Sequence, residues 1–422
     1  MRSFHSLIPF IALGLAPILA ADTGIRPGGS TGATEELRKW LTQPRDKRPA
    51  EPAGFAVTPL SRTDAAAAGR LLWEEHARFI RETRAKEMAA KAIELGGMRM
   101  KFETVSFGGR ESAPAGGRSL FISMHGGGGG ASPMNDQQWE NQVRLAKAYQ
   151  PREGIYLAPR APTNTWNLWH QSHIDDFFAR LIENLVVLDG VNPNRVYILG
   201  YSAGGDGVYQ LAPRMADRWA AASMMAGHPN AASPLGLRNI GFAIQVGALD
   251  SAYRRNTVAA DWGAKLDGLQ KADPAGYAHF TELHADKGHW MDLADRKAIP
   301  WMEKFTRNPL PDRIVWHQDG VLHTRFYWLS VPRDTAHAGQ DIVAVRKGQT
   351  IDLHSKDANT VVVRLNDRML NLDEPVTILS GGHALFSEKP TRNIATLRRT
   401  LEECGDPDFV FSAEVTVTGV QP

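Results

Sequence analysis

The stretch from Gly200 to Gly204, which reads Gly-Tyr-Ser-Ala-Gly, constrains the fold more than any other part of the chain. The apolar residues 195–199 before it predict a short buried strand, and residues 205–215 after it can start a helix. The glycines permit a tight turn, because a side chain two residues from the serine would collide with the neighbouring strand or helix. We therefore predict a strand, a sharp turn and a helix, with the hydroxyl of Ser202 raised on the turn as a nucleophile.

A second glycine-rich segment lies upstream. Residues 118–124 predict a strand that runs into His125 and five consecutive glycines. Attack of a serine on a carbonyl creates an oxyanion, which preorganised backbone N–H groups stabilise. We expect one donor to be the amide of Ala203 and the other to be the amide of Gly127 or Gly128. A phosphate cradle of the P-loop kind would need a Gly-Lys-Ser/Thr ending, which this loop lacks.

A carboxylate and an imidazole follow two later strands of the predicted sheet. The apolar residues 241–246 come just before Asp250, and a strand predicted at residues 278–283 comes before His289. A serine hydroxyl needs an imidazole to take its proton, and the imidazole needs a carboxylate to fix its tautomer and stabilise its cation. We expect Ser202 to be the nucleophile, Asp250 the acid and His289 the base.

The order serine, aspartate, histidine, the positions at strand ends and the glycine-rich loop together resemble the α/β-hydrolase fold superfamily over about residues 98–308. The resemblance implies a triad of Ser202, Asp250 and His289, with an oxyanion loop from His125 to Gly128. Gly205 extends the elbow to Gly-x-Ser-x-Gly-Gly. That form is similar both to prolyl-oligopeptidase-like peptidases and to secreted feruloyl-esterase and polyhydroxybutyrate-depolymerase-like enzymes, so the branch stays open.

Candidate substrate-binding residues follow the strand predicted at residues 155–158. Arg160 could pair with an acid group, and Trp166 and Trp169 could stack on sugar or phenolic rings. Packing of a long loop would explain both tryptophans equally well. His228, after the strand ending at residue 225, is a weaker candidate of the same kind.

The predicted mechanism needs neither cofactor nor metal. His170 and His173 could suggest a metal pair, but no third ligand clusters with them in the sequence. Only about sixteen residues connect the strand ending at residue 225 to the one starting at residue 242, which is too short for a cap domain. We expect an open site.

Strand patterns alternate with helical stretches through the middle of the chain, which predicts an α/β class with a mainly parallel sheet and helices on both faces. Beyond residue 309, short strand-like runs separated by turn residues predict a smaller, sandwich-like β-rich domain with one helix at residues 391–404. We therefore divide the folded chain into a catalytic domain, residues 63–309, and a C-terminal domain, residues 310–422. The second could pack on the enzyme or bind a polymer or surface.

The N-terminus has the pattern of an export signal. Residues 1–21 combine a short basic start, an apolar stretch and small residues near a cleavage point, while the apolar stretch is too short to span a membrane and contains two prolines. We expect a periplasmic or secreted protein with no transmembrane span in its mature form. Residues 22–62 have the composition of a flexible linker, and a helix-friendly stretch then runs from residue 64 to residue 95. Cys404 is the only cysteine, so no intrachain disulfide can form.

The net charge of +2 and the absence of a basic run argue against nucleic-acid binding. The sequence therefore predicts a serine hydrolase acting on a small-molecule or polymer-linked ester. A prolyl-oligopeptidase-like peptidase and a binding protein on a hydrolase scaffold are the alternatives, and the oligomeric state stays open.

Overall fold

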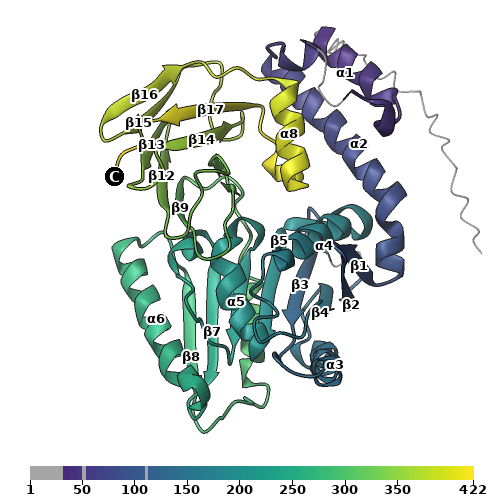
Figure 1. Cartoon of the computed structure of the whole chain (residues 1–422), viewed down its shortest axis with the longest axis vertical. Helices are drawn as coiled ribbons and strands as arrows, with labels where there is room; N and C mark the ends of the chain where they lie inside the picture. Colours follow the sequence, from purple (N-terminus) through teal and green to yellow (C-terminus); the bar gives the residue numbers. More distant parts are fainter. Residues whose placement is uncertain (1–31, 50–53, 110–112) are drawn as a thin grey trace, which may run out of the picture.

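The computed structural model describes residues 32–49, 54–109 and 113–422. Its centre is an eight-stranded sheet in the order β1-β2-β4-β3-β5-β6-β7-β8 (Figure 1). The strands are β1 (Ala92–Leu95), β2 (Met98–Phe107), β3 (Arg118–Met124), β4 (Gly154–Arg160), β5 (Val191–Tyr201), β6 (Ala221–Met225), β7 (Gly241–Gly247) and β8 (His279–His284). Along this order, neighbouring strands pair in parallel from β4 to β8. The strand β2 pairs antiparallel with both β1 and β4. The predicted α/β class is confirmed.

Helices cover both faces of this sheet, because its central strands are apolar on both sides. Alternate residues of one strand belong to different cores: Ile198 packs with the first cluster, and its neighbours Tyr197 and Leu199 pack with the second. The first cluster is completed by α4 (His173–Asp189), α5 (Ala203–Arg214) and α6 (Arg255–Ala272). The second is completed by α3 (Ser132–Tyr149) and α7 (Ala298–Met302).

The C-terminal part is rich in β-strands, as predicted, and forms two further sheets. One has the order β16-β15-β13-β12-β9 and the other the order β10-β11-β14-β17. The elements are β9 (Arg313–His317), β10 (Arg325–Phe326), β11 (Leu329–Ser330), β12 (Asp341–Lys347), β13 (Thr350–His354), β14 (Thr360–Leu365), β15 (Val376–Ser380), β16 (His383–Glu388), α8 (Ile394–Cys404) and β17 (Ala413–Thr418). The strands β13 and β16 are not predicted from the sequence.

The two β-sheets of the C-terminal part dock on the edge of the central sheet where its strands begin (Figure 1). Asn194, near the start of β5, donates to Asp408, and Asn239, just before β7, donates to the carbonyl of Arg313. Functional groups of parallel sheets gather at the opposite edge, beyond the carboxyl ends of the strands. The C-terminal sheets therefore leave that edge uncovered.

A buried ion pair holds the two parts together. Arg307, which follows the central sheet, binds Asp406 of the C-terminal part at 2.8 Å, and Arg218 lies 4.0 Å from the same carboxylate. Burial alone would raise the pKa of Asp406, but the two guanidinium groups lower it below its ordinary value. The carboxylate is consequently ionised and paired inside the protein.

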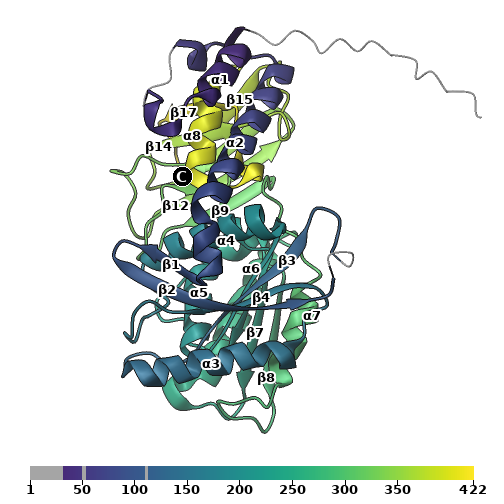
Figure 2. The ribbon, with the colours of Figure 1, turned by 90° about the vertical axis from the view of Figure 1, so that its right-hand side faces the viewer.

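Residues 32–49 and 54–62, the described part of the flexible linker predicted for residues 22–62, are structured. The helix α1 (Gly32–Thr42) buries Leu37 and Leu41 in a core shared with α2 (Arg62–Ala89) and α8. Figure 2 shows α2 running from the C-terminal part to the edge of the central sheet. The predicted signal, residues 1–21, lies outside the described residues. No described helix combines the length and apolarity needed to cross a membrane.

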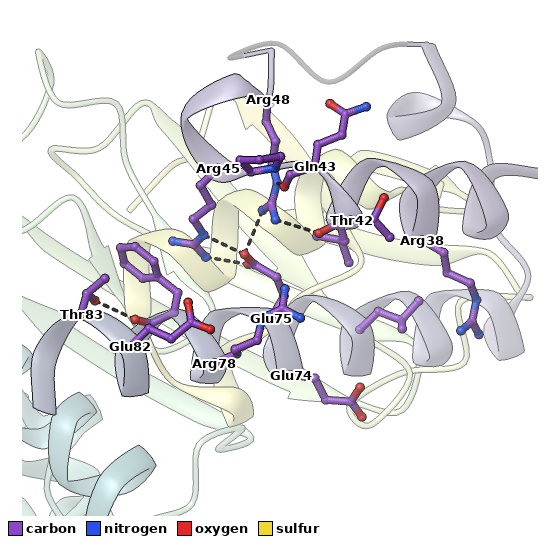
Figure 3. A pocket seen from close by; sticks show the side chains of 14 residues that line it. Arg38, Thr42, Gln43, Arg45, Arg48, Glu74, Glu75, Arg78, Glu82 and Thr83 are labelled. Carbon is purple, nitrogen blue, oxygen red and sulfur yellow. Dashed lines mark hydrogen bonds and ion pairs between the residues drawn. The ribbon is translucent and has the colours of Figure 1, made fainter.

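Ion pairs fasten this N-terminal segment to α2. Glu75 receives hydrogen bonds from Arg45 and Arg48, which approach it from the turn after α1 (Figure 3). The predicted helix start is confirmed, since Ser61 caps α2 by accepting from the amide of Asp64 at 3.1 Å. The predicted end is wrong: α2 stops at residue 89, and β1 then forms a hairpin with β2 across Gly96 and Gly97.

Removing the buried charge of Asp406 tests how much this ion pair contributes to stability. Asp406→Asn should lower the free energy of unfolding by about 3 kcal/mol at pH 7, because it leaves buried guanidinium groups without their counter-ion. Since the folded pKa of Asp406 is depressed, its contribution is present above the pKa of an unfolded aspartate, about 3.9, and is lost as the pH falls through the folded value.

Denaturant unfolding of wild type and variant across this pH range measures the effect. The exposed pair of Glu36 with Lys39 on α1 supplies the control, and Glu36→Gln should change stability by no more than about 0.5 kcal/mol. An Asp406→Asn protein as stable as wild type at pH 7 would contradict the assignment of this pair.

Candidate active site

Ser202 occupies a sharp turn between β5 and α5, as predicted. Its φ of 57° and ψ of −118° lie in a region that residues other than glycine rarely adopt, and its amide donates to the carbonyl of Met225 at 2.9 Å. The neighbouring backbone is packed closely enough to require glycine. A Cβ on Gly200 would overlap the backbone of Gly204, and a Cβ on Gly204 would overlap the carbonyl of Met124.

The three residues predicted to act together converge on this turn. His289 Nδ1 lies 2.7 Å from Asp250 Oδ2, and His289 Nε2 lies 3.0 Å from Ser202 Oγ. The Asp250 side chain is almost fully buried, whereas 43% of the His289 side chain is exposed. With Nδ1–H donating to the carboxylate, Nε2 keeps its lone pair for the serine hydroxyl proton.

Of the two glycine amides predicted as oxyanion donors, one is already bonded within the protein. The amide of Gly128 donates to Asn135 Oδ1 at 3.0 Å, so the prediction of Gly128 as a donor is corrected. Among the described residues, no acceptor is recorded for the amides of Gly127 and Ala203. Ala203 opens α5, where the first N–H groups have no partner within the helix. The loop lies beside Ser202, because a Cβ added to Gly126 would lie 3.2 Å from the Cβ of Ser202.

A buried histidine fixes this loop. His125 Nδ1 donates to the carbonyl of Gly126 at 2.6 Å, and Nε2 accepts from the amide of Ala161 at 3.1 Å. Burial lowers the pKa of His125 to about 4, which keeps the ring neutral and able to accept. Trp169 Nε1 donates to the His125 carbonyl at 2.9 Å. These hydrogen bonds of His125 and Trp169 therefore fix the backbone at the start of the glycine loop.

Two of the four predicted substrate-binding residues, Arg160 and Trp169, are buried and need correction. Arg160 is buried, and its guanidinium is taken up by Asp136 and Asn164. Trp169 is 0% exposed and packs in the core. Trp166 is 63% exposed and lies against the glycine loop, and His228 is half-buried with its amide donating to Asp206. None of the four predicted residues lines the cleft beside the nucleophile.

That cleft has a volume of about 690 Å³ and begins at Ser202. One wall is α3 and another is Trp290, the residue after His289. Its lining consists of Gly126, Gly127, Met134, Gln138, Asn141, Gln142, Arg144, Leu145, Tyr201, Ser202, His289 and Trp290. Sequence reasoning missed the α3 wall, although Met134, Gln138, Asn141 and Leu145 recur at the spacing of one helix face.

Tyr201 is a second residue that sequence reasoning missed. Its hydroxyl donates to the carbonyl of His289 at 2.6 Å and accepts from the amide of Met291 at 3.0 Å. Burial raises the pKa of the Tyr201 hydroxyl well above its ordinary value, so the group stays protonated and can donate. Tyr201, the residue before Ser202, thus anchors the loop that carries His289.

A third carboxyl group lies near the turn but does not join the three. Asp206 Oδ1 accepts from the amide of His228 at 2.6 Å, and burial raises the pKa of Asp206 to about 6. Asp206 lies in the first turn of α5, and the His289 ring bonds to Asp250 and Ser202 instead. Within the described part of the chain, no three His, Cys, Asp or Glu side chains are grouped to hold a metal ion, so His170 and His173 form no such centre there.

Comparisons with known proteins were made by sequence and by fold. No protein-family model matches the sequence, and no curated protein matches it. Solved structures do match. A thermostable esterase is 17% identical with a TM-score of 0.39, covering 51% of this chain and 62% of its own. A carboxylesterase from Mesorhizobium loti is 17% identical with a TM-score of 0.36, covering 50% of this chain and 98% of its own.

A ferulic acid esterase is 14% identical with a TM-score of 0.30, over 49% of this chain and 98% of its own. The strand order, the parallel pairing and the position of the serine turn after β5 decide the fold class. The chain has the α/β-hydrolase fold. About half of it lies beyond what these structures cover.

The hydrolase turn should not tolerate a side chain at Gly204. Gly204→Ala should unfold the protein or lower its free energy of unfolding by more than about 3 kcal/mol, because the clashing atom belongs to the backbone of β3 and cannot move aside. Gly268→Ala in α6 is the control. Nothing lies within 4 Å of its added Cβ, so stability should hold or rise by about 1 kcal/mol. Thermal unfolding compares the two, and a fully stable Gly204→Ala protein would contradict the close packing.

Proposed function

We propose that the protein is a serine hydrolase that cleaves carboxylic esters through an acyl-enzyme. The observation that supports this proposal is the chain of hydrogen bonds from Ser202 through His289 to Asp250. Among the described residues, the nearby amides of Gly127 and Ala203 have no acceptor. A serine, a base within hydrogen-bond reach and a carboxylate that orients the base form the arrangement that nucleophilic catalysis requires.

In the proposed first step, Ser202 Oγ attacks the ester carbonyl carbon while its proton passes to His289 Nε2. The carbonyl oxygen becomes an oxyanion facing the amides of Gly127 and Ala203, where each donor contributes about 3 to 4 kcal/mol. The carbon–oxygen bond to the alcohol then breaks, and the alcohol leaves with the proton from His289. Asp250 stabilises the imidazolium formed in between.

In the second step a water molecule replaces the alcohol. His289 takes a proton from the water as its oxygen attacks the acyl carbon, and the same proton returns to Ser202 Oγ when the acyl-enzyme bond breaks. The products are one acid and one alcohol, and the enzyme is restored. No cofactor enters the balance.

Replacing the nucleophile tests the proposal. Ser202→Ala should lower kcat/KM for ester hydrolysis at least about a thousandfold, since loss of a triad member removes the nucleophilic route. Initial rates on matched ester and peptide panels measure it, with the exposed Ser387→Ala as control. Equal rates for Ser202→Ala and wild type would remove Ser202 from the mechanism, and Ser202-dependent cleavage of peptides alone would replace the esterase assignment with a peptidase.

Removing the Tyr201 hydroxyl should weaken the base without removing it. Tyr201→Phe should lower kcat by about 10- to 100-fold with KM little changed, because the loop that positions His289 loses both hydrogen bonds. Tyr197→Phe is the matched control, since that hydroxyl on the same strand donates to the carbonyl of Phe305 at 2.9 Å and touches none of the three residues. Steady-state kinetics and thermal unfolding of both variants separate positioning from stability. Equal kcat values for the two variants would refute the role of Tyr201.

A further inference from the structure

One stripe of α3 forms a continuous wall of the cleft at Ser202. Met134, Gln138, Asn141 and Leu145 all line it and are separated by four, three and four residues, which places them on a single helix face. At 1.5 Å per residue the stripe extends for roughly 16 Å. The cleft is therefore long enough for a group that reaches well beyond the reacting carbonyl.

The lining carries no carboxylate, and its cation is already engaged. Among the lining residues, Arg144 is the only one with a permanent charge, and its guanidinium is held by Asn141 Oδ1 at 3.1 Å and by Glu140 at 3.1 Å. A substrate carboxylate would have to compete with Glu140 for this exposed guanidinium, and a substrate cation would meet no carboxylate in the lining. The cleft therefore favours an uncharged occupant.

Three side chains of the lining are apolar: Trp290, Met134 and Leu145. The Trp290 indole packs against the Tyr201 ring at a centroid distance of 5.6 Å and keeps 49% of its surface exposed. Met134 and Leu145 face the same space from α3. An indole face, a thioether and a branched alkyl chain suit an aromatic ring or a straight alkyl chain.

Two amide side chains add polar contacts along the same wall. Gln138 packs against the oxyanion loop, with its Oε1 3.6 Å from where a Cβ on Gly126 would lie. Asn141 keeps its amide N–H groups available while its oxygen accepts from Arg144. Neutral amides can bond an ester, ether or hydroxyl oxygen without demanding a charge on the ligand.

Exposed apolar side chains stand on two other loops at this edge of the sheet, outside the lining of the cleft, and we call these loops the open side. Trp166, Leu249 and Tyr253 stand on the loops after β4 and β7 with exposures of 63%, 65% and 78%. In an acyl-enzyme the acyl group stays bound through the second step, while the alcohol must leave and water must enter. A walled cleft suits the group that stays, and the open side suits the group that departs.

We propose that the cleft between α3 and Trp290 receives the acyl group, and that the substrates are esters of uncharged, elongated acids with an aryl or straight alkyl body. This assignment rests on the proposed function, because it requires an acyl-enzyme at Ser202. The alcohol lies at the open side, where its size is unrestricted.

A series of p-nitrophenyl esters with one constant leaving group tests the assignment. The hexanoate and 3-phenylpropionate esters should have kcat/KM at least tenfold above the acetate. The hemisuccinate should fall at least tenfold below the butyrate, which has the same chain length without the charge. A second series that varies the size of the alcohol of one phenylpropionate ester, at constant leaving-group pKa, should change kcat/KM by less than threefold.

Two variants on α3 locate the effect. Asn141→Trp narrows the cleft and should lower the ratio of phenylpropionate to acetate hydrolysis at least tenfold. Lys147→Trp adds the same side chain to an exposed position of α3 outside the lining and should leave that ratio unchanged. Circular dichroism and thermal unfolding show whether both variants are folded, and if Asn141→Trp is not, Leu145→Phe takes its place.

Each outcome bears on a different claim. Ester hydrolysis that depends on Ser202 but shows no acyl preference would overturn the cleft assignment and leave the proposed function standing. A hemisuccinate cleaved as fast as the butyrate would overturn the neutral character of the cleft, and a preference that follows the alcohol would place the other half of the ester there. Absence of hydrolysis from every ester would overturn the proposed function itself.

Discussion

The backbone turn at Ser202 is the constraint on which the site is built. A residue with a side chain is held at a positive φ, and such a conformation persists only where the surroundings over-determine it. Here the surroundings are backbone: Gly204 meets the carbonyl of Met124, and Gly205 meets that of Met225. The same contacts bring the start of α5 against β3 and β6, so the hydroxyl, the amide of Ala203 and the glycine loop are fixed by one packing arrangement.

The loops around the turn are then held by hydrogen bonds to side chains. His125 and Trp169 secure the glycine loop, and Tyr201 secures the loop that carries His289. Meanwhile the N-terminal helices and C-terminal sheets pack on the far side of the molecule, near where the central strands begin. The edge of the central sheet where its strands begin is therefore covered by the C-terminal sheets. At the opposite edge, which carries Ser202, several large apolar side chains are exposed.

The sequence predicts those parts of the site that depend on order along the chain. Ser202, Asp250 and His289 are found because each follows an apolar strand, and parallel strands end at one edge. Directions of side chains are not predictable in this way. Trp169 follows β4 as expected, but its indole turns inward and donates to the carbonyl of His125 in the loop after β3. The amide of Gly128 donates to the side chain of Asn135 on α3. Leu37 and Leu41 sit in a polar segment, and only their packing against α2 and α8 makes α1 part of a core.

The proposed chemistry requires the serine, the imidazole and the free amides to converge at one point. Reaction with a fluorophosphonate followed by peptide mass spectrometry tests this most directly, because the reagent reacts with an activated serine and leaves a covalent adduct. We expect the adduct on the peptide that contains Ser202 in the wild type, and labelling at least a hundredfold slower in His289→Ala. An adduct on any other residue, or an unlabelled wild-type protein, would contradict the account.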